Sequence, residues 1–311
     1  MPCLTSEVPM PETPSLPAQN RWSPGRTPVA VIMISLNEGH NIQAVLDNLR
    51  GWAQEVFLVD SYSADDTVDV ALANGVHVVQ RGFRGFGDQW NFALRELPVT
   101  APWVMKLDPD ERLTDTLKQS ITAALTEGDC AGYSFDLRLW FMGKPLPVRQ
   151  TIVRIWKTGV CRFSDVKVNE HPIVDGLVRQ LAGDLEHHDS PSLEHWLAKQ
   201  NKYTTGEAIA TFQGDALSVQ PALFGSGLQQ RMWLKKNFFR VPGRYTFLFF
   251  YNYLILGAWR SGWVGYVWSR LRSDVYRLIE YKLREMRIMG SVQVATISGL
   301  GKPDSRVQQY P

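Results

Sequence analysis

Two closely spaced carboxylates in this sequence could hold a divalent cation beside a diphosphate. Asp108 and Asp110 are separated by one residue and follow a short apolar run at 103–107. Such a pair can bind one hard cation, directly or through water, while a diphosphate supplies further oxygens. The cation would then neutralise a diphosphate leaving group. The pair alone is a weak signal, because solvated loops often carry two carboxylates.

Polar clusters follow three of the apolar runs, which makes the carboxylate pair more significant. Residues 35–38 read Ser-Leu-Asn-Glu after the run at 29–35, Asp60 and Ser61 follow the run at 56–59, and residues 108–111 read Asp-Pro-Asp-Glu. In open α/β sheets, ligands bind beyond the carboxyl ends of the strands. The three clusters are therefore expected at one functional edge.

Alternating apolar runs and helical stripes predict the fold that would form this edge. Buried strands are expected at 29–35, 56–59, 76–79 and 103–107, because short runs that are apolar on both faces are typical of parallel strands. Helices are expected at about 42–49, 65–74, 89–97 and 114–125, then strands at 133–139 and 151–156 and a helix at 193–212. This order predicts an α/β fold with a mostly parallel sheet flanked by helices.

Several other sites are disfavoured by the same residues. A phosphotransferase with an Asp-x-Asp-x-Thr nucleophile would place its pair after the first strand, whereas Asp108 follows the fourth expected strand. The glycines at 82, 85 and 87 do not have the spacing of a dinucleotide-binding loop, and the sequence contains no phosphate-binding Walker loop. The three cysteines are far apart, which argues against a disulfide framework.

Four motifs in order resemble the family-2 glycosyltransferases of the GT-A fold, in particular the bacterial lipopolysaccharide-core and exopolysaccharide branch. The motifs are Ser-Leu-Asn-Glu at 35–38, Val-Asp-Ser-Tyr-Ser-Ala-Asp-Asp-Thr at 59–67, Gly-Phe-Gly-Asp-Gln-Trp-Asn-Phe-Ala-Leu at 85–94 and Leu-Asp-Pro-Asp-Glu-Arg at 107–112. The resemblance runs from about residue 29 to 210, and more loosely to 287. It implies transfer of a sugar from a nucleotide diphosphate donor with inversion at the anomeric carbon.

The resemblance also implies roles for individual residues. The donor-binding residues would be Ser35, Asn37, Glu38, Asp60, Asn91 and Asp108. The ligands of Mg²⁺ or Mn²⁺ would be Asp108, Asp110 and His187, which lies in the motif Glu-His-His-Asp at 186–189. His187 matches the family's late histidine only slightly better than His188. A zinc site formed by His187, His188 and His195 is a competing hypothesis without a supporting ligand spacing.

An inverting transfer needs one general base to take the proton of the acceptor hydroxyl. Glu170 is our candidate, because the family has an acidic residue between its central strands and the later histidine. The family often has His-Glu where this chain has Asn169-Glu170, so the group that orients the base is undetermined. Glu111 and Asp165 are alternative bases.

Charge is distributed unevenly along the 311 residues. The whole chain has 33 basic and 31 acidic residues, but residues 231–287 contain twelve Lys or Arg and three Asp or Glu. The same stretch contains uncharged runs at 245–259 and 261–269, separated by Arg260. Neither run reaches the roughly 20 apolar residues of a spanning helix. Basic and aromatic residues beside apolar ones favour an element that lies on an anionic membrane.

Two other interpretations of this stretch remain. A nucleic-acid surface would also use basic and aromatic residues, but the long apolar block makes it unattractive, and no nucleic-acid partner is expected. An ordinary packed pair of helices is the more serious alternative.

We therefore expect four parts in the chain. They are a disordered Pro-rich leader at 1–28, a GT-A-like domain at 29–215, a basic aromatic helical membrane-associated element at 216–288 and a flexible tail at 289–311. The expected protein is cytoplasmic, peripheral to the inner membrane, and transfers sugar from a nucleotide-sugar, with a UDP-sugar favoured, to a lipid-linked or lipopolysaccharide-core saccharide. A polyprenyl-phosphate glycosyltransferase and a non-catalytic sugar-nucleotide or membrane scaffold protein are the alternatives.

Overall fold

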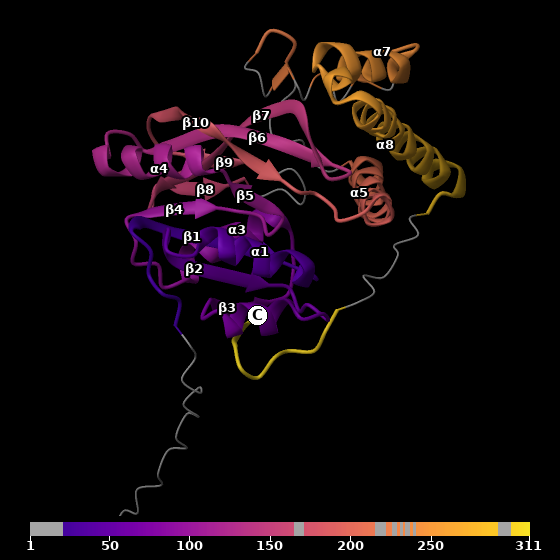
Figure 1. Ribbon diagram of the computed structural model, residues 1–311. Helices are drawn as coiled ribbons and strands as arrows, with labels where there is room; N and C mark the ends of the chain where they lie inside the picture. The colour runs from indigo at the N-terminus through magenta and orange to yellow at the C-terminus, as the bar shows by residue number, and fades with distance from the viewer. Residues whose placement is uncertain are drawn as a thin grey trace, which may run out of the picture.

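A nine-stranded mixed sheet forms the centre of the protein (Figure 1). The computed structural model describes residues 21–164, 171–214, 222–225, 229, 230, 233, 237, 238, 241–291 and 300–311. The strand order is β11-β3-β2-β1-β4-β7-β6-β10-β5, and five of the eight neighbouring pairs are parallel. The expected α/β fold with a mostly parallel sheet is therefore confirmed.

The N-terminal half contains the predicted alternation of strands and helices. Its elements are β1 (Thr27–Ser35), α1 (Gly39–Leu49), β2 (Ala53–Asp60), α2 (Thr67–Ala73), β3 (His77–Arg81), α3 (Phe86–Glu96), β4 (Trp103–Lys106), β5 (Glu111–Leu113) and α4 (Asp115–Glu127). The strands β6 (Gly132–Phe141) and β7 (Lys144–Lys157) form a long hairpin, followed by β8 (Cys161–Phe163), β9 (Pro172–Val174) and β10 (Val178–His187).

Helices cover both faces of the sheet, which explains why β1 is apolar on both sides. Val29, Val31 and Met33 of β1 face the core formed with α1, α2 and α4. Ala30 and Ile32 point to the opposite core, which contains α3 and Phe163 of β8. Side chains alternate between the two faces of a strand, so a central strand covered on both sides must be apolar throughout.

The C-terminal helices pack on the far end of the β6–β7 hairpin. They are α5 (Leu193–Gln213), α7 (Arg244–Phe250), the π-helix η2 (Tyr251–Ile255), the 3-10 helix η3 (Ala258–Ser261) and α8 (Gly262–Met289). Trp196 of α5 and Trp268 of α8 share a buried cluster with Phe141 and Leu146 of the hairpin. Among the described residues, no helix is both long enough and apolar enough to cross a bilayer.

Both ends of the described chain differ from the sequence-based expectation. We predicted a disordered leader to residue 28, but Trp22 donates from its backbone N to the Gly75 carbonyl at 2.7 Å and from its indole to the Ala53 carbonyl at 3.0 Å. We predicted a flexible tail at 289–311, but β11 (Gln308–Tyr310) pairs in parallel with β3 and closes that edge of the sheet. The tail prediction was wrong for 300–311, because hydrogen bonds, the buried side chain of Val307 and the packing of Tyr310 against Phe92 hold a segment that has no apolar run.

Gly183 controls how β10 passes over α4. The pairing of β10 with β6 shifts register between Gln180 and Asp184, and Gly183 has a φ of 104°. A Cβ at this position would lie 2.6 Å from the backbone N of Leu117. Glycine is thus required both by the backbone conformation and by the close contact.

We predict that Gly183→Ala destabilises the protein by roughly 2–4 kcal/mol, because backbone strain and a steric clash add. Gly159 is the matched control, since it has a φ of 87° but a Cβ there would meet no atom within 4 Å. Gly159→Ala should cost only the strain, about 1–2 kcal/mol. Urea unfolding curves of the two variants measure the difference, and equal losses would contradict the clash.

Candidate active site

The carboxyl ends of β1 and β2 are joined by a hydrogen-bond network around Asp60. Asp60 is fully buried and accepts from Ser35 Oγ at 3.0 Å, from the backbone N of Ser63 at 2.9 Å and from Gln80 Nε2 at 2.8 Å. Ser63 Oγ also donates to it. The carboxylate of Asp60 therefore fixes the shape of the loop after β2.

Asn37 and Glu38 form the opposite wall of this loop region. Asn37 has a φ of 58°, donates its backbone N to Ser63 Oγ at 2.8 Å and accepts from the backbone N of Ala64 at 2.7 Å. Asn41 Nδ2 donates to Glu38 Oε2 at 2.8 Å. Burial raises the pKa of Glu38 to about 7. Ser35, Asn37, Glu38 and Asp60 are thus brought to one edge, as the motifs predicted.

Asn91 lies apart from the hydrogen-bond network around Asp60 and contacts β8 instead. Its Nδ2 donates to the Phe163 carbonyl at 3.0 Å, and its Oδ1 accepts from the Phe163 backbone N at 2.8 Å. Asn91 therefore ties α3 to β8, just before residues 165–170. Asp165 and the predicted base Glu170 belong to that segment and lie outside the described residues.

Arg154 of β7 neutralises the carboxylates that follow β4. It is 8% exposed, and its Nη2 donates to Asp108 Oδ2 at 3.0 Å and to Glu111 Oε1. Burial raises the pKa of Glu111 to about 7. Burial would also raise the pKa of Asp108, but the charges of Arg154 and Lys106 outweigh it and hold that pKa low.

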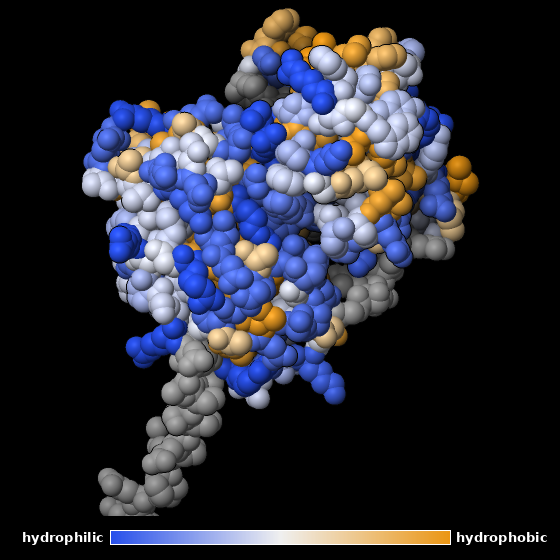
Figure 2. Space-filling view, viewed as in Figure 1, coloured by the Kyte–Doolittle hydropathy of each residue, from blue (hydrophilic) through white to orange (hydrophobic). Residues whose placement is uncertain are grey.

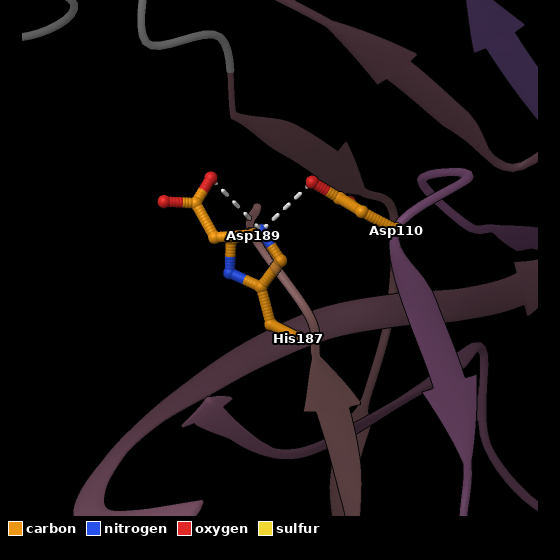
Figure 3. A group of neighbouring side chains, drawn as sticks. All are labelled: Asp110, His187 and Asp189. Atoms are coloured by element: carbon orange, nitrogen blue, oxygen red, sulfur yellow. Dashed lines mark hydrogen bonds and ion pairs between the residues drawn. The ribbon is translucent and has the colours of Figure 1, made fainter. Parts of the chain in front are cut away.

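Asp110 meets His187 and Asp189 in a group whose ligand atoms all lie within 4.8 Å of one another (Figure 3). His187 Nε2 lies 3.2 Å from Asp110 Oδ2 and 3.9 Å from Asp189 Oδ1. The Nδ1 atom of His187 is buried and has no hydrogen-bond partner among the described residues. Two carboxylates and one imidazole suit a divalent cation of the Mn²⁺ type.

Lys199 of α5 places a positive charge beside both carboxylates of this group. Its Nζ lies 3.0 Å from Asp110 Oδ2 and 2.6 Å from Asp189 Oδ1. Burial alone would raise the pKa of Asp110 and lower that of His187. The mutual attraction of Asp110 with His187 and Lys199 instead holds the Asp110 pKa well below its usual range and raises that of His187 to about 9.

The predicted metal ligands are only partly brought together. Asp110 and His187 belong to the group, whereas Asp108 pairs with Arg154 and lies outside it. His188 stacks on Trp140 at 4.6 Å between ring centroids, and His195 packs against His40 at 5.0 Å. These contacts favour His187 over His188, and they separate the three histidines of the zinc hypothesis.

Asp189 and Lys199 were not selected from the sequence, although one signal for Asp189 was available. Residues two apart in an extended segment point to the same side, so Asp189 would be expected beside His187. Lys199 carried no such signal, because only the tertiary packing of α5 brings it to Asp110.

A cleft of about 240 Å³ opens beside the Asp110 group. Its lining includes Trp140, Phe141 and Met142 of the β6–β7 hairpin together with His40, His188 and Ser190. The backbone N of His188 donates to the Asp110 carbonyl at 2.8 Å, which connects the cleft to the carboxylate site. Aromatic rings with hydroxyl and imidazole groups form a surface suited to a polar ring such as a sugar.

Comparison with known proteins identifies the class. Residues 30–171 match the family model described as glycosyl transferase family 2. Residues 30–171 are therefore assigned as a family-2 glycosyltransferase domain, and this match together with the curated relatives supports glycosyltransferase activity.

Two curated relatives extend the similarity beyond the family domain. The chain is 26% identical over 254 residues to the lipopolysaccharide core biosynthesis glycosyltransferase LpsC of Rhizobium meliloti (strain 1021), covering 78% of this chain and 86% of the relative. It is 24% identical over 274 residues to an uncharacterized glycosyltransferase of Rickettsia bellii (strain RML369-C), covering 84% of this chain and 87% of the relative.

Among solved structures, S. aureus TarS 1-349 in complex with UDP-GlcNAc has a TM-score of 0.40 at 13% identity, covering 87% of this chain and 95% of that chain.

The raised pKa of Glu38 predicts a pH-dependent stability. Between the ordinary value of 4.5 and the folded value of about 7, the folded protein keeps a proton that the unfolded chain releases. The free energy of unfolding should therefore fall as pH rises through this window, and the Glu38 contribution should level off above it. Glu38→Gln should remove this part of the slope, so that the variant gains stability relative to the wild type as pH rises. Urea unfolding at several pH values tests this, and parallel profiles would contradict the burial effect.

Proposed function

We propose that this glycosyltransferase is inverting and metal-dependent and takes its sugar from a nucleotide diphosphate donor, with a UDP-sugar as the first candidate. The observation that carries the proposal is the group of Asp110, His187 and Asp189, positioned next to the strand ends of a family-2 domain. Its acceptor would be a lipid-linked or lipopolysaccharide-core saccharide at the cytoplasmic face of the inner membrane.

The loops after β1 and β2 would bind the nucleoside. Asp60 holds the loop, and the half-buried side chains of Asn37 and Glu38 would offer polar groups to a base and a ribose. Ser35 acts through Asp60, since its hydroxyl donates to that carboxylate. Asp108 remains the candidate for the ribose, while Asn91 would position the segment after β8.

Mg²⁺ or Mn²⁺ would be held by Asp110 and His187, with Asp189 as a third ligand. The Nε2 atom of His187 faces both carboxylates, and the donor set of four carboxylate oxygens and one imidazole nitrogen fits such a cation. When bound, the cation would supply positive charge that stabilises the departing diphosphate. Arg154 would keep the neighbouring carboxylates of Asp108 and Glu111 in place.

Glu170 is the proposed general base. The alternative Glu111 is 1% exposed and accepts from Arg154 and from the backbone N of Asp108, so both of its oxygens are engaged. This engagement supports Glu170, which would remove the proton from the acceptor hydroxyl as that oxygen attacks the anomeric carbon opposite the diphosphate. The cleft lined by Trp140 and His188 would bind the acceptor saccharide.

An exposed apolar surface supports docking on a membrane. Figure 2 shows apolar side chains gathered over α7. The surface, here called the apolar ridge, is formed by large side chains that are at least 40% exposed: Phe247, Phe250, Tyr251, Leu254, Ile255, Trp259, Trp263 and Tyr266. The excess of basic residues over the sequence 231–287 complements an anionic bilayer, and a lipid-linked acceptor would be found there. The Rhizobium relative is a lipopolysaccharide core biosynthesis glycosyltransferase, which supports the same acceptor class.

The catalytic proposal is tested by release of nucleoside diphosphate and by transfer to membrane extract in the presence of Mn²⁺. Asp110→Asn should lose more than about 100-fold in transfer, because it removes charge that holds the cation. Glu170→Gln should lose about 100-fold or more in turnover while keeping donor affinity. Near-normal turnover of Glu170→Gln would move the base elsewhere, and full wild-type activity in chelator would refute the metal requirement.

We predict that Ile255→Ser combined with Trp263→Ser weakens binding to anionic vesicles by at least about 100-fold, since both side chains are more than 70% exposed and each contributes about 1.5–3 kcal/mol when buried. Leu177→Ser is the matched control, as Leu177 is 58% exposed but lies before β10. Sedimentation with phosphatidylglycerol-containing vesicles measures the effect. Unchanged binding of the double variant would show that the apolar ridge does not insert.

A further inference from the structure

The space between Asp110 and Asp189 is occupied by the side chain of Lys199. The ammonium group lies 3.0 Å from Asp110 Oδ2, 2.6 Å from Asp189 Oδ1 and 3.3 Å from the Asp189 carbonyl oxygen. Three oxygens thus surround one cation that belongs to the chain itself.

A divalent cation would need the same carboxylate oxygens. Mg²⁺ binds oxygen ligands at about 2.0–2.1 Å, so an ion held by Asp110 and Asp189 would lie almost on top of the present ammonium nitrogen. Two positive charges cannot share this small space. The ion and the Lys199 ammonium are therefore alternative occupants.

The surroundings allow the side chain, rather than the helix, to move. Lys199 retains 39% exposure of its side chain, so a path to solvent exists. The helix α5 is anchored on both sides of it: Trp196 is 5% exposed and packs against Phe141, and Ala208 is buried against Ile279 of α8. A lysine stem with four rotatable bonds can swing out while these contacts stay in place.

We propose that Lys199 is a built-in counter-ion that the divalent cation must displace, and that the donor diphosphate then receives the displaced ammonium. The inference rests on the proposed metal-dependent function. Before metal binds, Lys199 offsets the repulsion between Asp110 and Asp189. After it binds, the ammonium needs a new anion, and a diphosphate held by the same ion would lie within its reach.

Metal and donor binding should therefore be coupled. Metal alone separates the ammonium from Asp110 and Asp189, whereas metal together with a diphosphate provides it with a new anionic partner. Each ligand then raises the affinity for the other by the same factor, since coupling free energies are reciprocal. Lys199 is a positioning residue in this account, and its effect is visible in binding without any turnover.

Isothermal titration of Mn²⁺ into wild type and Lys199→Met, each with and without UDP, tests the inference. Without UDP, Lys199→Met should bind Mn²⁺ about 10-fold or more tightly than wild type, because no ammonium competes. UDP should raise the Mn²⁺ affinity of wild type by about 5–150-fold, the usual range of coupling, and that of the variant by clearly less. Lys202→Met is the matched control, since Lys202 is exposed on the same helix and should behave as wild type.

A second variant and a melting-temperature measurement keep the test decisive even if Lys199→Met does not fold. Lys199→Gln keeps hydrogen-bond donors for Asp110 and should fold even if the methionine variant does not. In chelator both variants should melt below wild type, and Mn²⁺ should raise their melting temperature more than it raises that of wild type.

The outcomes separate this inference from the proposed function. Equal or weaker Mn²⁺ affinity in the Lys199 variants, with clear binding to wild type, overturns the counter-ion role and leaves the metal-dependent function standing. Absence of Mn²⁺ binding in every protein, with UDP present, removes the metal from the proposed function and the inference with it.

Discussion

The buried carboxylate of Asp110 is the charge around which the active site is organised. It is 5% exposed, and a carboxylate in such a position is stable only when cations and hydrogen-bond donors neutralise it. The two cations come from separate elements, His187 at the end of β10 and Lys199 in α5. The loop after β4, the antiparallel pair of β10 with β5 and the docking of α5 all have to form for this charge to be tolerated.

The sequence revealed the strands and the acidic pair that follows β4, but not the residues that neutralise Asp110. The strands β1, β3 and β4 were predicted to within two residues of their ends, because a parallel strand covered on both faces is a continuous apolar run, whereas only residues 56–59 of β2 were predicted. Asp108 and Asp110 were recognisable because they follow such a run directly. Asp189 and Lys199 were not, since their contacts with Asp110 span about 80 to 90 residues and depend on how β10 and α5 pack.

The segment at 300–311, which was predicted to be flexible, is largely polar, and its hydrogen-bond partners lie far away along the chain. Residues 300–311 contain few apolar side chains, and nothing in their local pattern indicates a strand. They are held by the backbone N of Asp304 and the side chain of Gln309, which both donate to Gln80 Oε1. Hydrogen bonds of this kind leave no periodic trace in a sequence, so the segment was taken for a flexible tail.

Gln80 connects the C-terminal segment with Asp60, and this connection limits how the domain could be exchanged between enzymes. This buried side chain accepts from the segment through its oxygen and donates through its nitrogen to Asp60, so the last strand of the sheet supports the loop proposed to bind the nucleoside. The family-2 match covers residues 30–171, yet the site draws on His187, Lys199 and residues 300–311. The unit that could be exchanged between related enzymes is therefore larger than the recognisable domain. A chimera cut at the domain's boundary would inherit Asp60 and Asp110 without the distant groups that hold them.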